Sequence, residues 1–289
     1  MSDTLTFMAV HAHPDDEASS SGGILALLAS QGVRTVLVTC TNGEFGDAPG
    51  GVKPGDGDHD ADDVAVLRAK ELERAATALR VTRLVRLGYR DSGMRGWPQN
   101  DDPRSFWATP VDVAAGRLLE VMREERPQVV MTYNEHGFYG HPDHVQAHRI
   151  TMAAVAQLDY EPTVYFNAIP DSVMATWRER WEREEREKIE ADARLGIVRE
   201  PDPVDLSVDG EEIELGTPDD QIDAAIDVSA VNDAKYDALA AHESQLADSF
   251  WMKMTREEFA AVMRTEWFVR ATNPQDLAGC VNDIMAGYR

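Results

Sequence analysis

Short apolar runs alternate with segments of helical periodicity through the first half of the chain. Strands that are apolar on both faces and are separated by helices are typical of βαβ units in a parallel sheet. The pattern therefore predicts an α/β fold whose sheet is covered by helices on both faces. The expected strands are 5–10, 33–39, 83–87, 129–133 and 163–168, and the expected helices are 18–31, 62–80, 111–125 and 143–157.

The pattern changes after residue 168. We expect residues 1–168 to form the core of the fold and residues 169–289 to form a smaller α+β subdomain packed on it. Trp177 and Trp181 lie four positions apart in a strongly charged helical stretch, so both should face the body of the protein. The further expected elements are a helix over 171–195, a hairpin over 204–208 and 212–215 that turns at Asp209-Gly210, a strand over 222–228 and a helix over 231–243.

Polar loops follow four of the expected strands. Open α/β sheets bind ligands outside the carboxyl ends of their strands, so these loops should share one functional edge. Two of the loops, 44–63 and 88–110, are long for a compact domain, and loops of that length are usually functional or disordered. We interpret both as walls of a ligand cleft.

The composition narrows the classes of partner. The chain has 289 residues, with 28 Lys and Arg against 52 Asp and Glu, for a formal charge of −24. Such a surface repels phosphate backbones and anionic lipids, so neither nucleic acid nor a membrane is an expected partner. Two cysteines are too few for a disulfide framework, and no apolar run approaches the ~20 residues that span a bilayer. A cytoplasmic protein is expected, with homo-oligomerisation left open.

Two short motifs rich in histidine and aspartate lie directly after buried strands. His13 and Asp16 follow the first strand, and His144 follows the fourth after a short loop. Three protein ligands with one position left for water is the usual layout of a catalytic zinc site. The spacing therefore predicts a divalent metal held by these three residues, and with it metal-assisted hydrolysis.

The residues beside the predicted ligands suit the proton transfers of that reaction. Asp15 is adjacent to Asp16 and is expected to be the general base that takes a proton from the attacking water. His141 is expected to donate a hydrogen bond to the oxyanion or to protonate the leaving amine, with Asp143 orienting it.

Other residues of the same segments receive structural interpretations. His11 is expected in the core or supporting the site, and Glu17 at the start of a helix, where its charge suits the helix dipole. His59 and His148 are expected at the surface. Cys40 is expected to be a small buried apolar residue.

The two motifs resemble a known family. Ala12-His13-Pro14-Asp15-Asp16-Glu17 and His141-Pro142-Asp143-His144 are similar to the paired motifs of the PIG-L/LmbE-like deacetylases. The similarity is closest to the mycothiol-pathway members, the N-acetylglucosaminyl-inositol deacetylase and the mycothiol S-conjugate amidase. It runs over residues 5–168 and returns at Ala241-His242-Glu243-Ser244-Gln245. The resemblance implies a Rossmann-like fold, Zn²⁺ with Fe²⁺ as the other candidate, and hydrolysis of an N-acyl amide.

The resemblance also implies residues that contact the substrate. Arg68 matches an arginine that contacts substrate hydroxyls, and Asp91 matches an aspartate of the substrate cleft. Tyr139 matches a tyrosine that helps hold the tetrahedral intermediate. Ser20 and His242 are expected at the substrate as well, and the region 169–289 is expected to shape the cleft.

Two departures bear on the choice of substrate. The conjugate amidase has lysine where this chain has Ser20, and proline where this chain has Gly140, so both positions follow the sugar deacetylase. The loop 135–138 is bulkier than its Gly-rich counterpart, and the C-terminal half resembles neither enzyme well.

Three hypotheses remain at this point. The leading one is a metal-dependent deacetylase acting on an N-acetylated amino sugar or glycoside. The second is an amidase acting on a mycothiol-type thiol conjugate or a secondary-metabolite intermediate. The third is a non-catalytic small-molecule or metal-binding module, which the presence of Asp15 disfavours. A dinucleotide-binding enzyme is disfavoured too, because no Gly-x-Gly-x-x-Gly follows the first strand.

Overall fold

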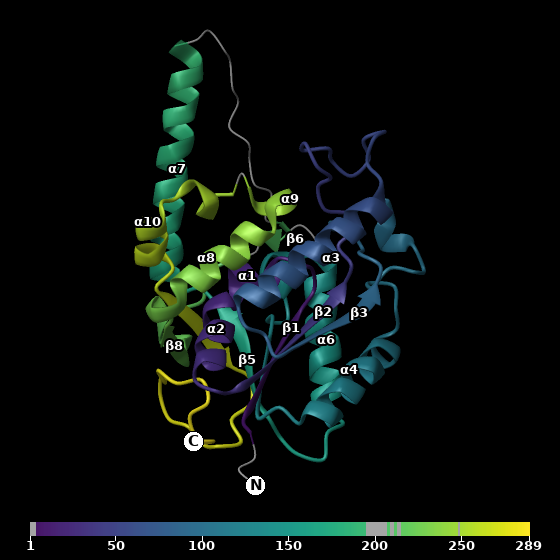
Figure 1. The fold of residues 1–289 in the computed structure, drawn as a ribbon, viewed down its shortest axis with the longest axis vertical. Coiled ribbons are helices and arrows are strands. Elements are labelled where there is room, and N and C mark those ends of the chain that lie inside the picture. The colour runs from purple at the N-terminus through teal and green to yellow at the C-terminus, as the bar shows by residue number, and fades with distance from the viewer. Residues whose placement is uncertain (1–3, 195–206, 209–210, 213–214, 248) are drawn as a thin grey trace.

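A seven-stranded mixed sheet forms the centre of the protein (Figure 1). The computed structural model describes residues 4–194, 207–208, 211–212, 215–247 and 249–289. The strand order is β3-β2-β1-β4-β5-β9-β8; the first five strands are parallel, and β9 is antiparallel to both β5 and β8. The strands are β1 (Thr6–His11), β2 (Arg34–Thr41), β3 (Arg83–Tyr89), β4 (Val129–Thr132), β5 (Thr163–Ala168), β8 (Ala224–Asp227) and β9 (Thr265–Arg270).

Helices cover both faces of this sheet, as the sequence pattern predicts. Phe7 of β1 belongs to one buried cluster and its neighbour Met8 to the other, because successive side chains of a strand point to opposite faces. Helices α2, α3 and α8 pack on one face, and α4 and α6 on the other (Figure 1). Their bounds are α2 (Gly22–Ser30), α3 (Ala61–Ala78), α4 (Val111–Glu125), α6 (Pro142–Val155) and α8 (Asn232–Ala241).

The expected helix over 18–31 is two helices. The first, α1 (Asp16–Ser20), begins earlier than expected, and the chain leaves helical geometry at Ser21, where φ is −144° and ψ is 10°. The Ser21 hydroxyl lies 2.8 Å from His11 Nε2, a buried contact that fixes the break against β1.

The sheet extends into the C-terminal region, where β9 and β8 add antiparallel strands to the predicted parallel sheet. Strand β8 lies within the expected strand 222–228, whereas the sequence pattern did not predict β9. Glu266 interrupts the apolar pattern of β9, yet it is only 5% exposed because Lys235 Nζ contacts it at 2.7 Å. The division of the chain at residue 168 stays a prediction.

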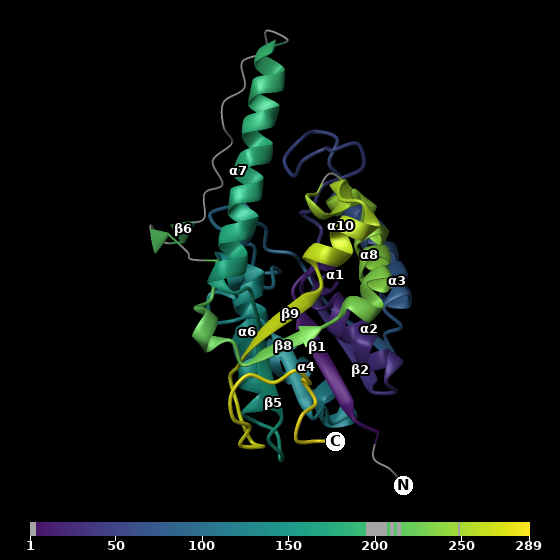
Figure 2. The ribbon, with the colours of Figure 1, turned by 90° about the vertical axis from the view of Figure 1, so that its left-hand side faces the viewer.

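Helix α7 (Asp171–Arg194) projects beyond the sheet (Figure 2). Trp177 is buried at its base, as expected, whereas Trp181 is 37% exposed and packs edge-on against Phe250. Strands β6 (Ser207–Val208) and β7 (Glu211–Glu212) pair in antiparallel fashion, while the rest of the expected hairpin, with its turn at 209–210, lies outside the described residues.

The remaining described elements are short. Among the described residues, none of the helices is long and apolar enough to cross a membrane. These elements are α5 (Gly137–Gly140), α9 (Glu243–Leu246), α10 (Arg256–Val262) and the 3-10 turns η1 (Pro98–Asp101), η2 (Asp219–Gln221), η3 (Ser229–Val231) and η4 (Trp251–Lys253).

Candidate active site

The polar loops converge on one pocket at the carboxyl edge of the parallel strands. The two long loops both contribute to it, which confirms the expectation that they form cleft walls. The pocket is lined by His13, Asp15, Asp16, Phe45, Gly46, Arg68, Asp91, Gly93, Met94, Trp97, Tyr139 and His141.

His13 lies between three carboxylates at the bottom of this pocket. Its Nε2 is 3.2 Å from Asp143 Oδ2 and its Nδ1 is 3.4 Å from Asp16 Oδ2. Burial by itself lowers the pKa of His13, but Asp91, Asp143 and Asp16 together raise that pKa well above its ordinary value. In the neutral His13 ring whose Nε2–H donates to Asp143, Nδ1 carries no proton, and its lone pair points toward Asp16.

His144 directs one ring nitrogen toward a backbone carbonyl and the other toward Asp16. Its Nδ1 lies 3.2 Å from the carbonyl oxygen of Gly137, whereas its buried Nε2 has no hydrogen-bond partner among the described residues. Nε2 lies 3.4 Å from Asp16 Oδ1. Gly137 has a φ of +66°, and a Cβ there would lie 2.6 Å from the backbone nitrogen of Val145, so the turn requires glycine.

These donor atoms fit a metal ion. A metal-binding histidine normally donates its second N–H to a carboxylate or carbonyl, and His13 and His144 both have that arrangement. Two groups of described residues bring one donor atom each within 4.8 Å of one another: His13, His141 and His144 in one, and His13, Asp91 and Asp143 in the other. The pocket can therefore hold a metal, with Asp16 beside both of its predicted histidine ligands.

Asp15 is held in a strained position at the start of α1. Its φ of 117° is rare for a residue other than glycine. Glu17 Oε2 accepts its N–H at 3.0 Å, and Arg68 Nη2 donates to its Oδ2 at 3.0 Å. Burial raises the pKa of Asp15 to about 6, while Arg68 acts to lower it. A carboxylate with a pKa near neutrality suits a general base.

Asp143 contacts His141 as expected, through its backbone N–H and not through its carboxylate. The Asp143 backbone N–H donates to His141 Nδ1 at 3.1 Å, so the proton of the neutral ring belongs on Nε2. The Asp143 carboxylate instead contacts His13 and accepts from the Ser92 backbone N–H at 2.9 Å. Burial, with further contributions from His13 and His144, lowers the pKa of His141 well below 6.5. The His141 ring is therefore neutral and offers its Nε2–H as a hydrogen-bond donor.

Tyr139 and Asp91 complete the polar lining. The Tyr139 ring centroid lies 4.9 Å from that of His144, and burial raises the pKa of its phenol well above 10, so it stays protonated. Asp91 Oδ1 lies 3.7 Å from His13 Nε2 and accepts from the Gly93 backbone N–H at 2.8 Å. Both residues lie where the sequence resemblance places them, inside the pocket.

Comparison with known proteins identifies the family. Residues 8–155 match the model of the PIG-L family, described as GlcNAc-PI de-N-acetylase, which is more than half of the chain. This protein belongs to the PIG-L family. The family is one of metal-dependent deacetylases, so the prediction of an N-acyl hydrolase is confirmed at that level and the non-catalytic hypothesis is set aside.

Relatives of this PIG-L protein share nearly its full length. A protein of Acidothermus cellulolyticus is 39% identical over 98% of this chain and 94% of its own, and one of Thermobifida fusca is 41% identical over 83% of each. Both are named 1D-myo-inositol 2-acetamido-2-deoxy-alpha-D-glucopyranoside deacetylase.

Solved structures share the fold at low identity. The N,N'-diacetylchitobiose deacetylase of Pyrococcus horikoshii has a TM-score of 0.57 at 20% identity, covering 93% of this chain and 84% of its own. A 4-carboxy-2-hydroxymuconate hydratase from a Pseudomonas has a TM-score of 0.54 at 17% identity, covering 95% of this chain and all of its own. The same architecture therefore carries different reactions, and the site residues decide the chemistry.

Two predicted substrate residues of this PIG-L protein lie outside the pocket. His242 follows α8 and is wholly buried, and its Nε2 lies 2.6 Å from Glu17 Oε1. It therefore stands behind α1, where it holds Glu17, and does not face a substrate in this pocket. Ser20 lines a neighbouring pocket together with Phe138. Arg68 does reach the active-site pocket, where it also donates to the carbonyl oxygen of Gly43 at 2.7 Å.

His11 and Cys40 lie in the core, whereas His59 and His148 are half-buried. His11 is fully buried, which confirms its expected place in the core, and Cys40 is buried as expected. The prediction that His59 and His148 lie at the surface is wrong, because both are half-buried. His59 Nε2 lies 2.9 Å from the carbonyl oxygen of Gly46, and His148 Nδ1 lies 2.9 Å from that of Tyr133. Each ring packs against the backbone of a loop.

Sequence reasoning missed two residues that support the site. Glu44 is 5% exposed, and its Oε2 accepts the Asp91 backbone N–H at 2.9 Å. The Ser92 hydroxyl donates to Asp143 Oδ1, and the Ser92 backbone N–H donates to Oδ2. Their positions directly after β2 and β3 were the available signal, but their partners lie 47 and 51 residues away in the chain.

Proposed function

We propose that this PIG-L protein removes the acetyl group from an N-acetylglucosaminyl-inositol glycoside, with Zn²⁺ as the metal. The observation that carries the proposal is the unpartnered Nε2 of His144 beside Asp16 and His13, with Asp15 on the same helix turn. The substrate follows the names of the full-length relatives. Ser20 and Gly140 favour the deacetylase over the conjugate amidase.

His13, Asp16 and His144 would hold the metal. When bound, the metal polarises the acyl oxygen and acidifies a water molecule. The Asp15 carboxylate accepts the proton of the attacking water, and Arg68 keeps that carboxylate in place. Once protonated, Asp15 is the group placed to return the proton to the leaving amine. The strained backbone of Asp15 fixes the direction of its side chain.

His141 and Tyr139 act on the oxygen that gains charge during the attack. With Nδ1 accepting a backbone N–H, neutral His141 offers Nε2–H to the developing oxyanion. This geometry favours the oxyanion role over protonation of the amine. The Tyr139 hydroxyl, which stays protonated at neutral pH, adds a second donor. Asp91 is placed to accept from a sugar hydroxyl.

The test measures amine release by the zinc-loaded protein from N-acetylglucosaminyl-inositol, N-acetylglucosamine and a mycothiol-type conjugate. We expect the first to react fastest. D15N should retain zinc and lose at least about 10²-fold in kcat, since general-base catalysis contributes that much. D159N, an exposed carboxylate paired with Arg126, is the matched control and should keep full activity. Preference for the conjugate would establish the amidase instead, and full activity of D15N would remove the proposed base. The expected cytoplasmic location and homo-oligomerisation stay predictions.

A further inference from the structure

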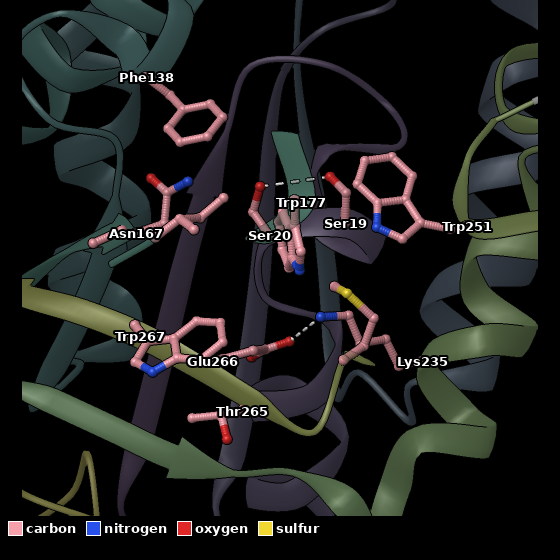
Figure 3. Close-up of a pocket in the computed structure, with 13 residues that line it drawn as sticks. Ser19, Ser20, Phe138, Asn167, Trp177, Lys235, Trp251, Thr265, Glu266 and Trp267 are labelled. Carbon is pink, nitrogen blue, oxygen red and sulfur yellow. Dashed lines mark hydrogen bonds and ion pairs between the residues drawn. The ribbon is translucent and has the colours of Figure 1, made fainter. Parts of the chain in front are cut away.

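A second pocket, called the aromatic pocket because four aromatic side chains are among the residues that line it, lies beside the candidate active site. It lies between the end of β5, the start of β9, the end of α1, helix α7 and η4. Figure 3 shows Phe138, Asn167 and Trp267 on one side of it and Trp251 on the other. We propose that this pocket binds an uncharged, hydroxylated ring, such as a cyclitol, that is joined to the amino sugar of the substrate. The inference rests on the proposed function.

Two polar atoms of the residues that line this pocket are buried, one on Asn167 and one on Trp251. Asn167 is 8% exposed, and neither its Oδ1 nor the Nε1 of Trp251 has a hydrogen-bond partner among the described residues. Buried polar groups in folded proteins are nearly always hydrogen-bonded. An amide oxygen accepts and an indole N–H donates, so a ligand with hydroxyl groups can satisfy both. The Ser20 hydroxyl, 3.5 Å from Ser19 Oγ, adds a group of either kind.

Aromatic surface makes up much of the rest of the lining. Trp177 is buried beneath the pocket, and Trp251, Trp267 and Phe138 are half-buried around it. A cyclitol or sugar ring has apolar C–H faces, which pack on aromatic rings, and a polar rim of hydroxyls. A hydrocarbon ligand would pack on the same surfaces but would leave Asn167 Oδ1 unpaired, which is unfavourable. The combination therefore favours a hydroxylated ring.

The charges in the pocket cancel. Lys235 Nζ contacts Glu266 Oε1 at 2.7 Å, and Glu266 also accepts the backbone N–H groups of Gly23 and Ile24, each at 2.8 Å. The cation is therefore already paired by a carboxylate whose two oxygens are both engaged. A phosphate or carboxylate ligand would find no free cation among the residues that line the pocket. An uncharged ring fits this surface better than an anion.

The pocket adjoins the active site through two neighbouring residues. Phe138 lines the aromatic pocket and Tyr139 lines the active site, with ring centroids 6.3 Å apart. Helix α1 also connects the two pockets. Asp16 at its start lines the active site, and Ser20 at its end, about 6 Å along the helix axis, lines the aromatic pocket. A ring one glycosidic bond from the amino sugar therefore reaches the aromatic pocket.

The kinetic test compares a substrate of two rings with a substrate of one. The variants are N167L, which removes the amide group with its unpaired Oδ1, and W267A, which removes one aromatic wall. W107A is the control, since Trp107 packs on Arg149 outside both pockets. We expect kcat/KM for N-acetylglucosaminyl-inositol to fall at least about tenfold through KM, and that for N-acetylglucosamine to stay within about twofold. Equal losses on both substrates, or no loss on either, would overturn the inference.

A binding test separates this inference from the proposed function. Titration with myo-inositol, followed by tryptophan fluorescence, needs no turnover. We expect saturable binding to the unmodified protein, loss of binding in N167L, and weaker binding of myo-inositol phosphate. Absence of inositol binding, or tighter binding of the phosphate, would contradict the proposed pocket. If neither glycoside is cleaved but inositol binds, the proposed function fails and the pocket stands.

Discussion

Glu17 and His242 lie 225 positions apart in the chain, and their side chains meet at 2.6 Å with neither exposed to solvent. The second oxygen of Glu17 accepts the Asp15 backbone N–H at 3.0 Å. Burial by itself lowers the pKa of His242, but the Glu17 carboxylate raises it above 6.5 overall. His242, from the C-terminal region, therefore holds the proposed general base Asp15 in place through Glu17.

Replacement of His242 should reduce both stability and turnover. H242Q leaves the Glu17 carboxylate buried without its partner, so the free energy of unfolding should fall by about 3–5 kcal/mol. The loosened Glu17 should lower kcat more than it changes KM, because Asp15 loses its position. Urea unfolding and steady-state kinetics measure the two effects. H59Q, at a half-buried histidine whose Nε2 lies 2.9 Å from the backbone carbonyl of Gly46, should alter both far less. A stable, fully active H242Q would contradict the positioning role.

Replacement of Asp143 should weaken metal binding. Its carboxylate lies 3.2 Å from His13 Nε2, where it sets the orientation of the ring, and loss of such a partner costs about 10–100-fold in metal affinity. Competition with a chelator for zinc should show this loss in D143N, and excess zinc should restore part of the turnover. Asp112 occupies the same first-turn position of helix α4 and is exposed, so D112N is the matched control. Equal zinc affinity in both variants would argue against the role.

An alanine at Gly137 should disturb His144. The φ of +66° and a Cβ only 2.6 Å from the Val145 nitrogen make the substitution strained, at a cost of about 1–3 kcal/mol. Because the Gly137 carbonyl contacts His144, zinc affinity should fall as well. Gly116 lies inside helix α4, where a Cβ meets no described atom within 4 Å, so G116A should gain about 0.5–1 kcal/mol. Thermal unfolding should show a lower midpoint temperature for G137A and a higher one for G116A than for the unmodified protein.

Glu125 should make the stability depend on pH in the acidic range. Hydrogen bonds from Arg34 and then Arg83 hold the pKa of this carboxyl below 4.5. A depressed carboxyl pKa gives stability that is present above the unfolded-state pKa and is lost as pH falls through the folded-state pKa. E125Q should therefore cost about 1–2 kcal/mol at neutral pH, and this cost should shrink as the pH is lowered toward about 3.

The neighbouring Glu124 provides the control for that measurement. It contacts Arg83 at 2.9 Å but its side chain is 63% exposed, so solvent screens the pair. E124Q should change the free energy of unfolding by less than about 0.5 kcal/mol at either pH. Urea unfolding of the three proteins at both pH values makes the comparison, and an E125Q deficit that persists in acid would contradict the assignment.

The regular parts of the fold could be predicted because burial imposes a local period on the sequence. The five parallel strands and their covering helices all carry that period. The break at Ser21 was not predictable in this way, because it depends on a contact with His11 ten positions earlier on β1. Strand β9 was not predictable from the pattern, because Glu266 has the character of a surface residue and is buried only through its contact with Lys235.

The sequence by itself determined the chemistry of the site, since His13, Asp15 and Asp16 lie in one turn and His141 and His144 in another. Residues so near one another in the chain remain neighbours in any fold in which the turn is ordered. Only the tertiary structure decided what stands behind them: Asp143 against His13, His242 against Glu17, and Ser20 in a separate aromatic pocket. Those pairings join segments up to 225 residues apart, and packing of whole elements selects them, so no local pattern records them.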